Sequence, residues 1–142
     1  MIREYKKGDE IAIAAIEEEC FSLPWSSQGI IDALWEGARF LVFEEAGDIL
    51  GYVGIRFVLD EGYIYNVAVK KEHRRKGIAQ ALLEKIDELA DRLELSFVSL
   101  EVRESNTAAV SLYEKMGYGK DGIRPNFYEF PRENAIIMTK RR

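Results

Sequence analysis

The clearest periodic pattern in the chain lies between Gly77 and Leu93, where apolar residues recur every three or four positions. This spacing places them on one face of a helix with 3.6 residues per turn, with charged residues on the opposite face. We therefore predict a long amphipathic helix here that packs against a core through six residues: Ile78, Leu82, Leu83, Ile86, Leu89 and Ala90.

A second helix is predicted near the start of the chain, over Glu10–Phe21. Gly8-Asp9 offers a helix start, and apolar residues follow it. The spacing predicts that Ile11, Ala15 and Ile16 face the core.

Two shorter helices follow residues whose side chains cap helix N-termini. Ser26 or Ser27 precedes a segment that ends near Glu36, and Ser105 or Asn106 precedes one that runs to Met116. Serine and asparagine oxygens accept hydrogen bonds from the free amides of a first helical turn. We therefore predict four helices in all.

Seven β-rich segments separate these helices. In one of them Tyr63, Tyr65, Val67 and Val69 alternate with other residues, the period of a strand with one face buried. The element order is β-α-α-β-β-β-α-β-α-β-β, which predicts a mixed α/β fold in layers. The strands are expected at Met1–Tyr5, Phe40–Glu44, Ile49–Leu59, Tyr63–Val69, Leu95–Val102, Tyr118–Tyr128 and Ala135–Thr139.

Length and composition narrow the class of protein. The 142 residues suit one domain, 1–142, and 47% hydrophobic residues suffice for a core. The net charge of −5 argues against a nucleic-acid partner held by a basic face. With one cysteine, Cys20, and one histidine, neither a disulfide nor a Cys/His zinc site is expected. Without a signal peptide or an apolar membrane span, we expect a cytoplasmic protein with no membrane partner.

One basic loop is a candidate anion site. The segment 70–76 joins a β-rich run to the long helix, and it contains Arg74, Arg75 and Lys76 directly before Gly77. The free amides of a helix N-terminus and the helix dipole favour an anion there, and glycine allows close approach of a ligand. The segment could bind a pyrophosphate, or it could be a solvated loop that only caps the helix.

Four blocks of residues resemble a known family. Arg74-x-x-Gly77-x-Ala79 is similar to the R/Q-x-x-G-x-G/A motif of the GNAT acetyltransferase superfamily. The block Leu100–Tyr118 looks like the L-E-V-R-x-S-N-x-x-A-x-x-L-Y-x-x-x-G-F signature of its RimI-like branch. The blocks Phe21–Ser26 and Ile123–Tyr128, the latter followed by Asn134–Met138, resemble the start and the closing hairpin of that branch. One departure is Phe127-Tyr128, where the branch often has two tyrosines.

The resemblance implies a GNAT fold, with a mixed, mostly antiparallel seven-stranded sheet, four helices and two central strands that splay apart for acetyl-CoA. Val67, Ala68 and Val69 would pair with the pantetheine arm of acetyl-CoA, and Asn106 would contact the same arm. The loop residues Arg74, Arg75, Lys76, Gly77, Ile78, Ala79 and Gln80 would hold the pyrophosphate.

The resemblance also implies that Glu101 is a general base and Tyr113 a general acid, in a direct transfer that needs no metal. Trp25, Tyr65 and Tyr128 would contact the substrate. From the residues alone other interpretations stay open: Glu101 on the solvent face of a strand, Tyr113 in the core and Asn106 as a helix cap.

The resemblance implies acetylation of the N-terminal amine of a protein, with ribosomal proteins as candidate substrates. The first alternative is an acetyltransferase for a lysine side chain, a small amine or a polyamine. The second alternative is a sensor or subunit that binds acyl-CoA without catalysis; Glu101 and Tyr113 at the expected positions argue against it.

Overall fold

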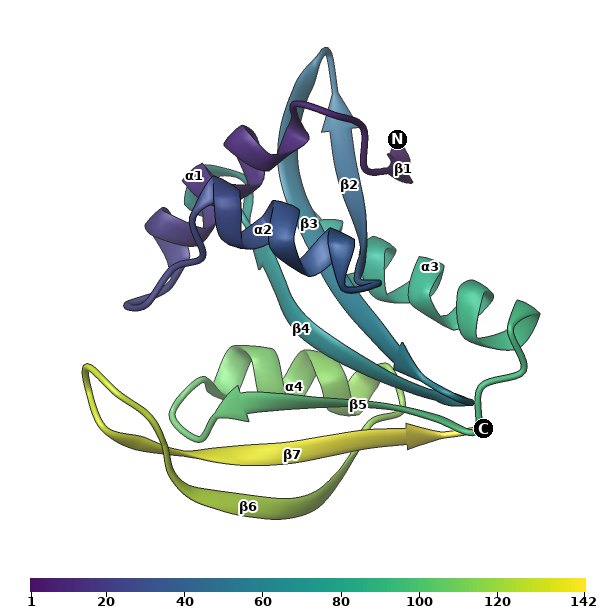
Figure 1. Cartoon of the computed structure of the whole chain (residues 1–142). Helices are drawn as coiled ribbons and strands as arrows, with labels where there is room; N and C mark the ends of the chain where they lie inside the picture. The colour runs from purple at the N-terminus through teal and green to yellow at the C-terminus, as the bar shows by residue number, and fades with distance from the viewer.

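The computed structural model describes residues 1–142 and contains one seven-stranded sheet (Figure 1). The strand order is β1-β2-β3-β4-β5-β7-β6, and every neighbouring pair is antiparallel except β4 and β5. The strands are β1 (Ile2–Glu4), β2 (Arg39–Glu45), β3 (Asp48–Val58), β4 (Glu61–Val69), β5 (Phe97–Arg103), β6 (Gly119–Tyr128) and β7 (Glu133–Arg141). The predicted fold class and order of elements are confirmed.

Four helices cover the two faces of the sheet. α1 (Asp9–Cys20) and α2 (Ser27–Trp35) pack on one face, while α3 (Ile78–Arg92) and α4 (Thr107–Lys115) pack on the other. A single 3-10 turn, Lys71–His73, lies in the basic loop before α3. None of these helices combines the length and the apolar character that crossing a membrane requires.

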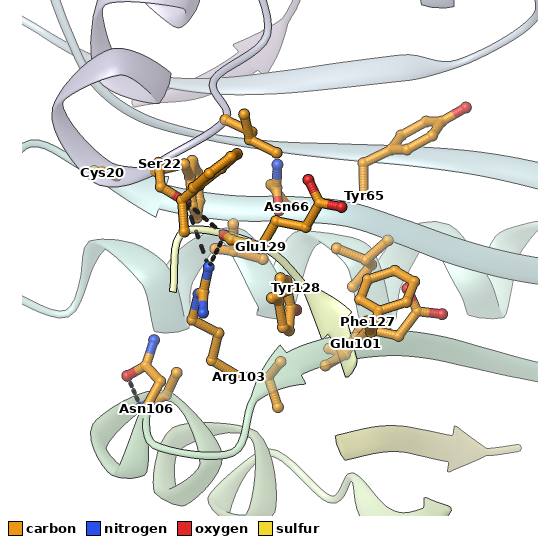
Figure 2. A pocket seen from close by; sticks show the side chains of 18 of the residues that line it. Cys20, Ser22, Tyr65, Asn66, Glu101, Arg103, Asn106, Phe127, Tyr128 and Glu129 are labelled. Atoms are coloured by element: carbon orange, nitrogen blue, oxygen red, sulfur yellow. Dashed lines mark hydrogen bonds between the residues drawn. The ribbon is translucent and has the colours of Figure 1, made fainter. Parts of the chain in front are cut away.

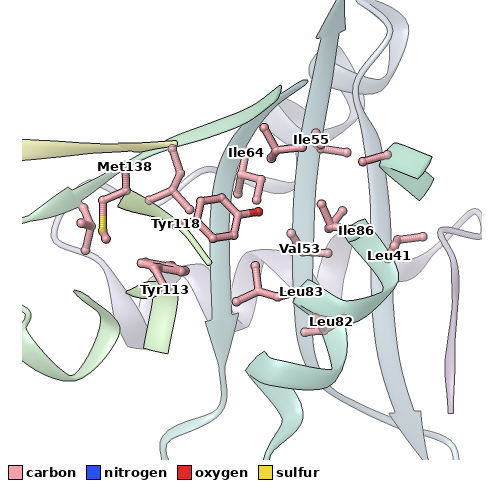
Figure 3. Close-up of a cluster of buried hydrophobic side chains, with 14 of the residues drawn as sticks. Leu41, Val53, Ile55, Ile64, Leu82, Leu83, Ile86, Tyr113, Tyr118 and Met138 are labelled. Carbon is pink, nitrogen blue, oxygen red and sulfur yellow. The ribbon is translucent and has the colours of Figure 1, made fainter. Parts of the chain in front are cut away.

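The larger core lies between the sheet and the α3/α4 layer (Figure 3). All six apolar positions predicted for the long helix are buried there, and Leu82, Leu83 and Ile86 have no exposed surface. Burying a leucine or isoleucine side chain contributes about 1.5–3 kcal/mol. This face therefore fixes α3 and, with it, the loop at its N-terminus.

The smaller core lies under α1 and α2, and here one prediction is wrong. Ile11 is 69% exposed and Ala15 is exposed, whereas Ile13, Ile16 and Glu17 are buried. Residues 11–16 are all apolar, so several faces of the helix offer apolar side chains and the spacing does not single one out. The face that meets the sheet is decided by tertiary packing.

A β-bulge interrupts β4 beside the place where the sheet opens. Gly54 of β3 pairs with Asn66, but Ile55 pairs with Ile64, so that Tyr65 is the extra residue. The predicted alternation, which placed Tyr65 and Val67 on one face of the strand, is therefore wrong at the bulge. Val67 packs towards α3, whereas Tyr65 packs towards α1 and α2.

The central strands β4 and β5 separate after a short contact. Only residues 61–63 of β4 pair with residues 97–99 of β5, and the two strands diverge from there. The expected splay of two central strands is therefore confirmed. Beyond the contact, each strand presents a backbone edge without a partner strand on that side.

Candidate active site

A cavity of about 540 Å³ lies where β4 and β5 separate (Figure 2). Its walls come from residues 64–67 of β4, 100–103 of β5, and α4 with its N-cap. The ends of α1 and β6 and the loops that follow them complete it, through residues 20–23 and 127–131. The sheet topology thus gathers segments that are more than 100 residues apart in sequence.

Glu101 lines this cavity from β5. Its carboxylate accepts a hydrogen bond from Nε of Arg124 on β6 at 3.1 Å, and 34% of its side chain is exposed. The register places Glu101 opposite Ile137 of β7, and Ile137 opposite Gly122 of β6. Arg124 follows Gly122 by two residues, so it lies on the same face of the sheet and reaches the carboxylate diagonally.

Tyr113 reaches the same cavity from α4, although its side chain is largely buried. Its ring centroid is 6.0 Å from that of Tyr118 in the larger core. Burial raises the pKa of the Tyr113 phenol, and the nearby Tyr128 raises it further. Tyr113 is therefore both a core residue and a cavity residue, and its hydroxyl keeps its proton at working pH.

The three residues predicted to bind substrate are not equivalent. Tyr65 and Tyr128 line the cavity, whereas Trp25 does not. The Trp25 ring packs edge-on against Tyr65, with centroids 4.9 Å apart, and also against Phe40 of the smaller core. Trp25 therefore lies behind Tyr65. Burial raises the pKa of Tyr128 to about 12, so this hydroxyl can donate a hydrogen bond near neutral pH.

The loop before α3 and the first turn of that helix present a row of free amides. The six backbone N–H groups of residues 75–80 donate no hydrogen bond within the protein. Gly77 has φ 79° and Arg75 has φ 65°, both in the left-handed region. Left-handed residues in a loop turn successive amides towards one side and create an anion-binding concavity. The site predicted from the basic loop thus has the donors that a pyrophosphate requires.

The edge of β4 continues from this loop towards the cavity. The Lys70 amide donates to Leu50 of β3, so residues of the same parity, including Ala68, direct their backbone groups to β3. Val67 and Val69 consequently direct theirs to the open edge. The Val69 carbonyl there accepts hydrogen bonds from Nε of Arg74 at 3.4 Å and from the Cys20 thiol at 3.5 Å. The Arg74 side chain thus folds back onto the strand.

Asn106 lies at the junction of β5 and α4. Its side-chain oxygen accepts the Ala109 amide at 3.2 Å, so it is the N-cap of α4, and it also lines the cavity. The cap interpretation of Asn106 is confirmed, and the contact with the pantetheine arm that the resemblance implies stays a prediction.

Two polar groups of the site are not predicted by the sequence. Asn66 lines the cavity and donates to the buried carboxylate of Glu17 on α1 at 3.1 Å. Burial raises the pKa of Glu17, although the hydrogen bond from Asn66 opposes this shift. Arg103 connects the β6–β7 loop to β5. Asn66 is a polar residue in a mostly apolar stretch of β4, whereas Arg103 shares β5 with the polar residues Ser99 and Glu101, so the sequence does not single it out.

Comparison with known proteins agrees with this geometry. Residues 11–118 match the model of the acetyltransferase (GNAT) family. A Bacillus subtilis (strain 168) protein provisionally named a ribosomal protein bS18-alanine N-acetyltransferase is 36% identical over 139 residues, which cover 96% of this chain and 92% of that protein. The ribosomal protein bS18-alanine N-acetyltransferase of Escherichia coli (strain K12) is 36% identical over 128 residues, covering 87% and 85% of the two chains.

Solved structures show the same fold. The crystal structure of the ribosomal-protein-S18-alanine N-acetyltransferase from Escherichia coli superposes with a TM-score of 0.93 and 31% identity, over 99% of this chain and 92% of that one. A GNAT family acetyltransferase from Elizabethkingia anophelis with acetyl-CoA bound has a TM-score of 0.81 at 18% identity, over 100% and 97%. Family model, sequence identity and fold agree, and the chain belongs to the GNAT family of N-acetyltransferases, in which it resembles the ribosomal-protein-alanine enzymes.

Proposed function

We propose that this enzyme transfers an acetyl group from acetyl-CoA to the N-terminal α-amine of a substrate protein. We further propose that this substrate is a ribosomal protein, like the bS18 substrate named for the relatives. The observation that carries the proposal is the meeting of Glu101 and Tyr113 in one cavity between the diverging strands β4 and β5. The Glu101 carboxylate would accept a proton from the amine, and the Tyr113 phenol would donate one to the leaving sulfur. A ribosomal substrate would also place the reaction in the cytoplasm.

The chain has matching groups for acetyl-CoA. The open edge at Val67 and Val69 offers backbone groups for the amides of the pantetheine arm, in the manner of an added strand. The six free amides of residues 75–80 and the exposed cations Arg75 and Lys76 suit the pyrophosphate. Acetyl-CoA supplies an activated thioester, and these groups would hold its carbonyl beside the cavity.

Glu101 would act as the general base, directly or through a water molecule. Acetyl transfer requires a neutral amine that attacks the thioester carbonyl, so one proton must leave the nitrogen. The pKa of an α-amine is about 7.7–8.0, against about 10.4 for lysine, so a carboxylate suffices as base for an N-terminus near neutral pH. Attack forms the amide bond while the carbon–sulfur bond breaks.

Tyr113 would act as the general acid. The leaving sulfur carries away the electron pair of the broken bond and takes up one proton to become a thiol. Burial keeps the Tyr113 phenol protonated, so this side chain can supply that proton. The proton accepted at Glu101 and the proton released at Tyr113 balance over one turnover.

The outer part of the cavity favours an extended acceptor. Three apolar side chains remain largely exposed at its rim: Leu23 is 60% exposed, Phe127 is 47% exposed and Phe130 is 69% exposed. An enzyme for a small amine would enclose its ligand, whereas an exposed apolar rim offers contacts to the residues that follow a peptide N-terminus. This arrangement supports a peptide acceptor over a polyamine.

The proposal is tested by thiol release from acetyl-CoA with a panel of acceptors. The panel holds peptides with a free N-terminus, the same peptides with a blocked N-terminus and an internal lysine, and polyamines. We expect release only with free α-amines. Release only with lysine peptides or polyamines would overturn the choice of substrate. Binding of acetyl-CoA without release for any amine would favour the alternative of a non-catalytic sensor.

A further inference from the structure

Arg103 is the last residue of β5, and its guanidinium fastens two loops that form the outer wall of the cavity (Figure 2). Nη1 donates to the Pro131 carbonyl at 2.9 Å and to the Glu133 carboxylate at 3.0 Å. Nη2 donates to the Glu129 carbonyl at 3.0 Å and to the Ser22 hydroxyl at 3.4 Å. The acceptors come from the β6–β7 loop, from β7 and from the α1–α2 loop.

The same guanidinium also fixes an aromatic wall of the cavity. Its central carbon lies 4.5 Å from the centroid of the Tyr128 ring. A guanidinium over an aromatic face is attracted by the ring and restricts its orientation. Tyr128 lines the cavity together with Glu101, whose charge helps to raise the pKa of Tyr128. Arg103 therefore sets the position of a side chain that faces the site without itself being a proton donor or acceptor for the reaction.

The network extends to the start of α4 through Glu133. One oxygen of this carboxylate binds Arg103, and the other accepts the Ser105 amide at 2.5 Å. The Arg103 and Glu133 side chains are only 24% and 16% exposed, so the pair is partly shielded from water. Apart from the bonds of Arg103, the two loops are joined by a hydrogen bond from the Ser22 hydroxyl to the Glu129 carbonyl at 3.3 Å.

We infer that Arg103 is a positioning residue for the acceptor: it holds the β6–β7 loop and the α1–α2 loop in the arrangement that receives the peptide N-terminus. The inference rests on the proposed function, in that the acceptor is a peptide. The acetyl-CoA groups, the β4 edge and the amides of residues 75–80, lie outside this network. Loss of Arg103 should thus weaken acceptor binding and leave acetyl-CoA binding intact.

The first test is kinetic and uses Arg103→Gln and Arg103→Lys. We expect the KM for a free-N-terminus peptide to rise about tenfold or more, as the loss of charge-assisted hydrogen bonds implies. The dissociation constant of acetyl-CoA, measured by calorimetry, should stay within about twofold of the wild-type value. Lysine should not restore the KM, because an ammonium group lacks the planar fork that reaches carbonyls on two loops.

The matched control is Arg132→Gln in the same loop. Arg132 is exposed and makes no hydrogen bond or ion pair, so this variant loses the same charge without a contact. We expect its acceptor KM to stay near the wild-type value. Equal effects of Arg132→Gln and Arg103→Gln would assign the loss to net charge and overturn the inference, as would an unchanged KM in Arg103→Gln.

The second test does not depend on activity. Hydrogen exchange of the backbone amides of residues 127–130, 132 and 133 is compared in the free wild-type protein, Arg103→Gln and Arg132→Gln. Exchange in this segment should become at least about tenfold faster only in Arg103→Gln, while α3 keeps its protection. Unchanged exchange in a folded Arg103→Gln overturns the inference. If the wild type acetylates no peptide, the proposed function fails, yet the exchange experiment still decides whether Arg103 holds the loops.

Discussion

Arg124 Nε lies 3.1 Å from Glu101 Oε1, which makes an edge-strand cation the direct partner of the proposed base. The two side chains are 55% and 34% exposed. Such exposed pairs contribute little to stability, about 0–1 kcal/mol. The pair can nevertheless orient the carboxylate at the cavity, and catalysis is far more sensitive to orientation than folding is.

Replacement of Arg124 should therefore separate activity from stability. We expect Arg124→Gln to lower kcat roughly tenfold, because the carboxylate is no longer held on one side. The urea midpoint should hardly change, since the pair is solvent-exposed. Steady-state kinetics and urea unfolding on the same preparation check this. A large fall in stability, or unchanged kinetics, would contradict it.

Glu101→Gln and Tyr113→Phe test the two proton-transfer roles. Each should lower kcat by roughly 100-fold or more, the usual range for loss of a positioned acid or base. Calorimetric binding of acetyl-CoA should be retained in both, because neither side chain belongs to the loop amides or the β4 edge. Glu104→Gln, an exposed residue directly after β5, is the control and should retain activity. Full activity in either cavity variant would exclude that residue's proposed role.

The pH–rate profile tests the state of Tyr113. Its ordinary pKa of 10.0 is raised by burial, so the phenol keeps its proton above the range in which an exposed tyrosine titrates. We expect no decline in kcat up to about pH 10 that could be assigned to loss of this proton. A decline in kcat near about pH 9 that is present in the wild type and absent from the residual activity of Tyr113→Phe would contradict this. It would show that the Tyr113 phenol loses its proton there despite its burial.

The buried carboxylate of Glu17 should make stability depend on pH. Because burial raises its folded-state pKa above the ordinary value of 4.5, the folded state holds its proton more tightly than the unfolded state. For this group, stability is greatest below pH 4.5 and falls as pH rises through the folded-state pKa. The fall amounts to about 1.4 kcal/mol for each pH unit that separates the folded-state pKa from the unfolded-state pKa.

Glu17→Gln removes this dependence and keeps an oxygen that can accept from Asn66. The unfolding free energy of Glu17→Gln relative to wild type should increase between about pH 4 and about pH 8 in urea titrations. Glu18→Gln, an exposed neighbour on α1, should follow the wild type at every pH. A constant difference across this range would mean that folding does not raise the pKa of Glu17.

Gly77→Ala tests the amide row before α3. Gly77 has φ 79°, and an added methyl group would meet no atom within 4 Å, so the cost is backbone strain and not a clash. We expect a loss of about 1 kcal/mol in stability and weaker acetyl-CoA binding, as the loop relaxes and its amides turn. Gly119→Ala, equally open but without a positive φ, is the control. Unchanged acetyl-CoA binding in Gly77→Ala would show that the cofactor does not use these amides.

The features that could be predicted from the sequence are those determined by interactions between residues close together in the chain. The apolar face of α3 could be predicted because polar residues surround it, and the Asn106 cap because it depends on the next three residues. The free amides of residues 78–80 follow from the geometry of any helix start. Each of these features depends only on residues within a few turns of the same segment, so the local sequence is sufficient to predict it.

Other features depend on distant segments and could not be predicted. The inward face of α1 is fixed by packing on the sheet, and the bulge at Tyr65 by the register with β3. The bonds of Arg103 reach partners 26 to 81 residues away, so β5 alone gives no indication of them. The resemblance implied that Trp25 contacts the substrate, but its ring packs behind Tyr65 and does not line the cavity.

The short contact between β4 and β5 has a consequence for heat resistance. Three register pairs join the two halves of the sheet, so backbone hydrogen bonding at this seam is weaker than in any full-length strand pair. A ligand that bonds along the seam binds the folded chain and not the unfolded one, and it raises the melting temperature with the logarithm of its concentration. With acetyl-CoA bound along this seam as proposed, the melting temperature of the enzyme should follow the supply of its acetyl donor.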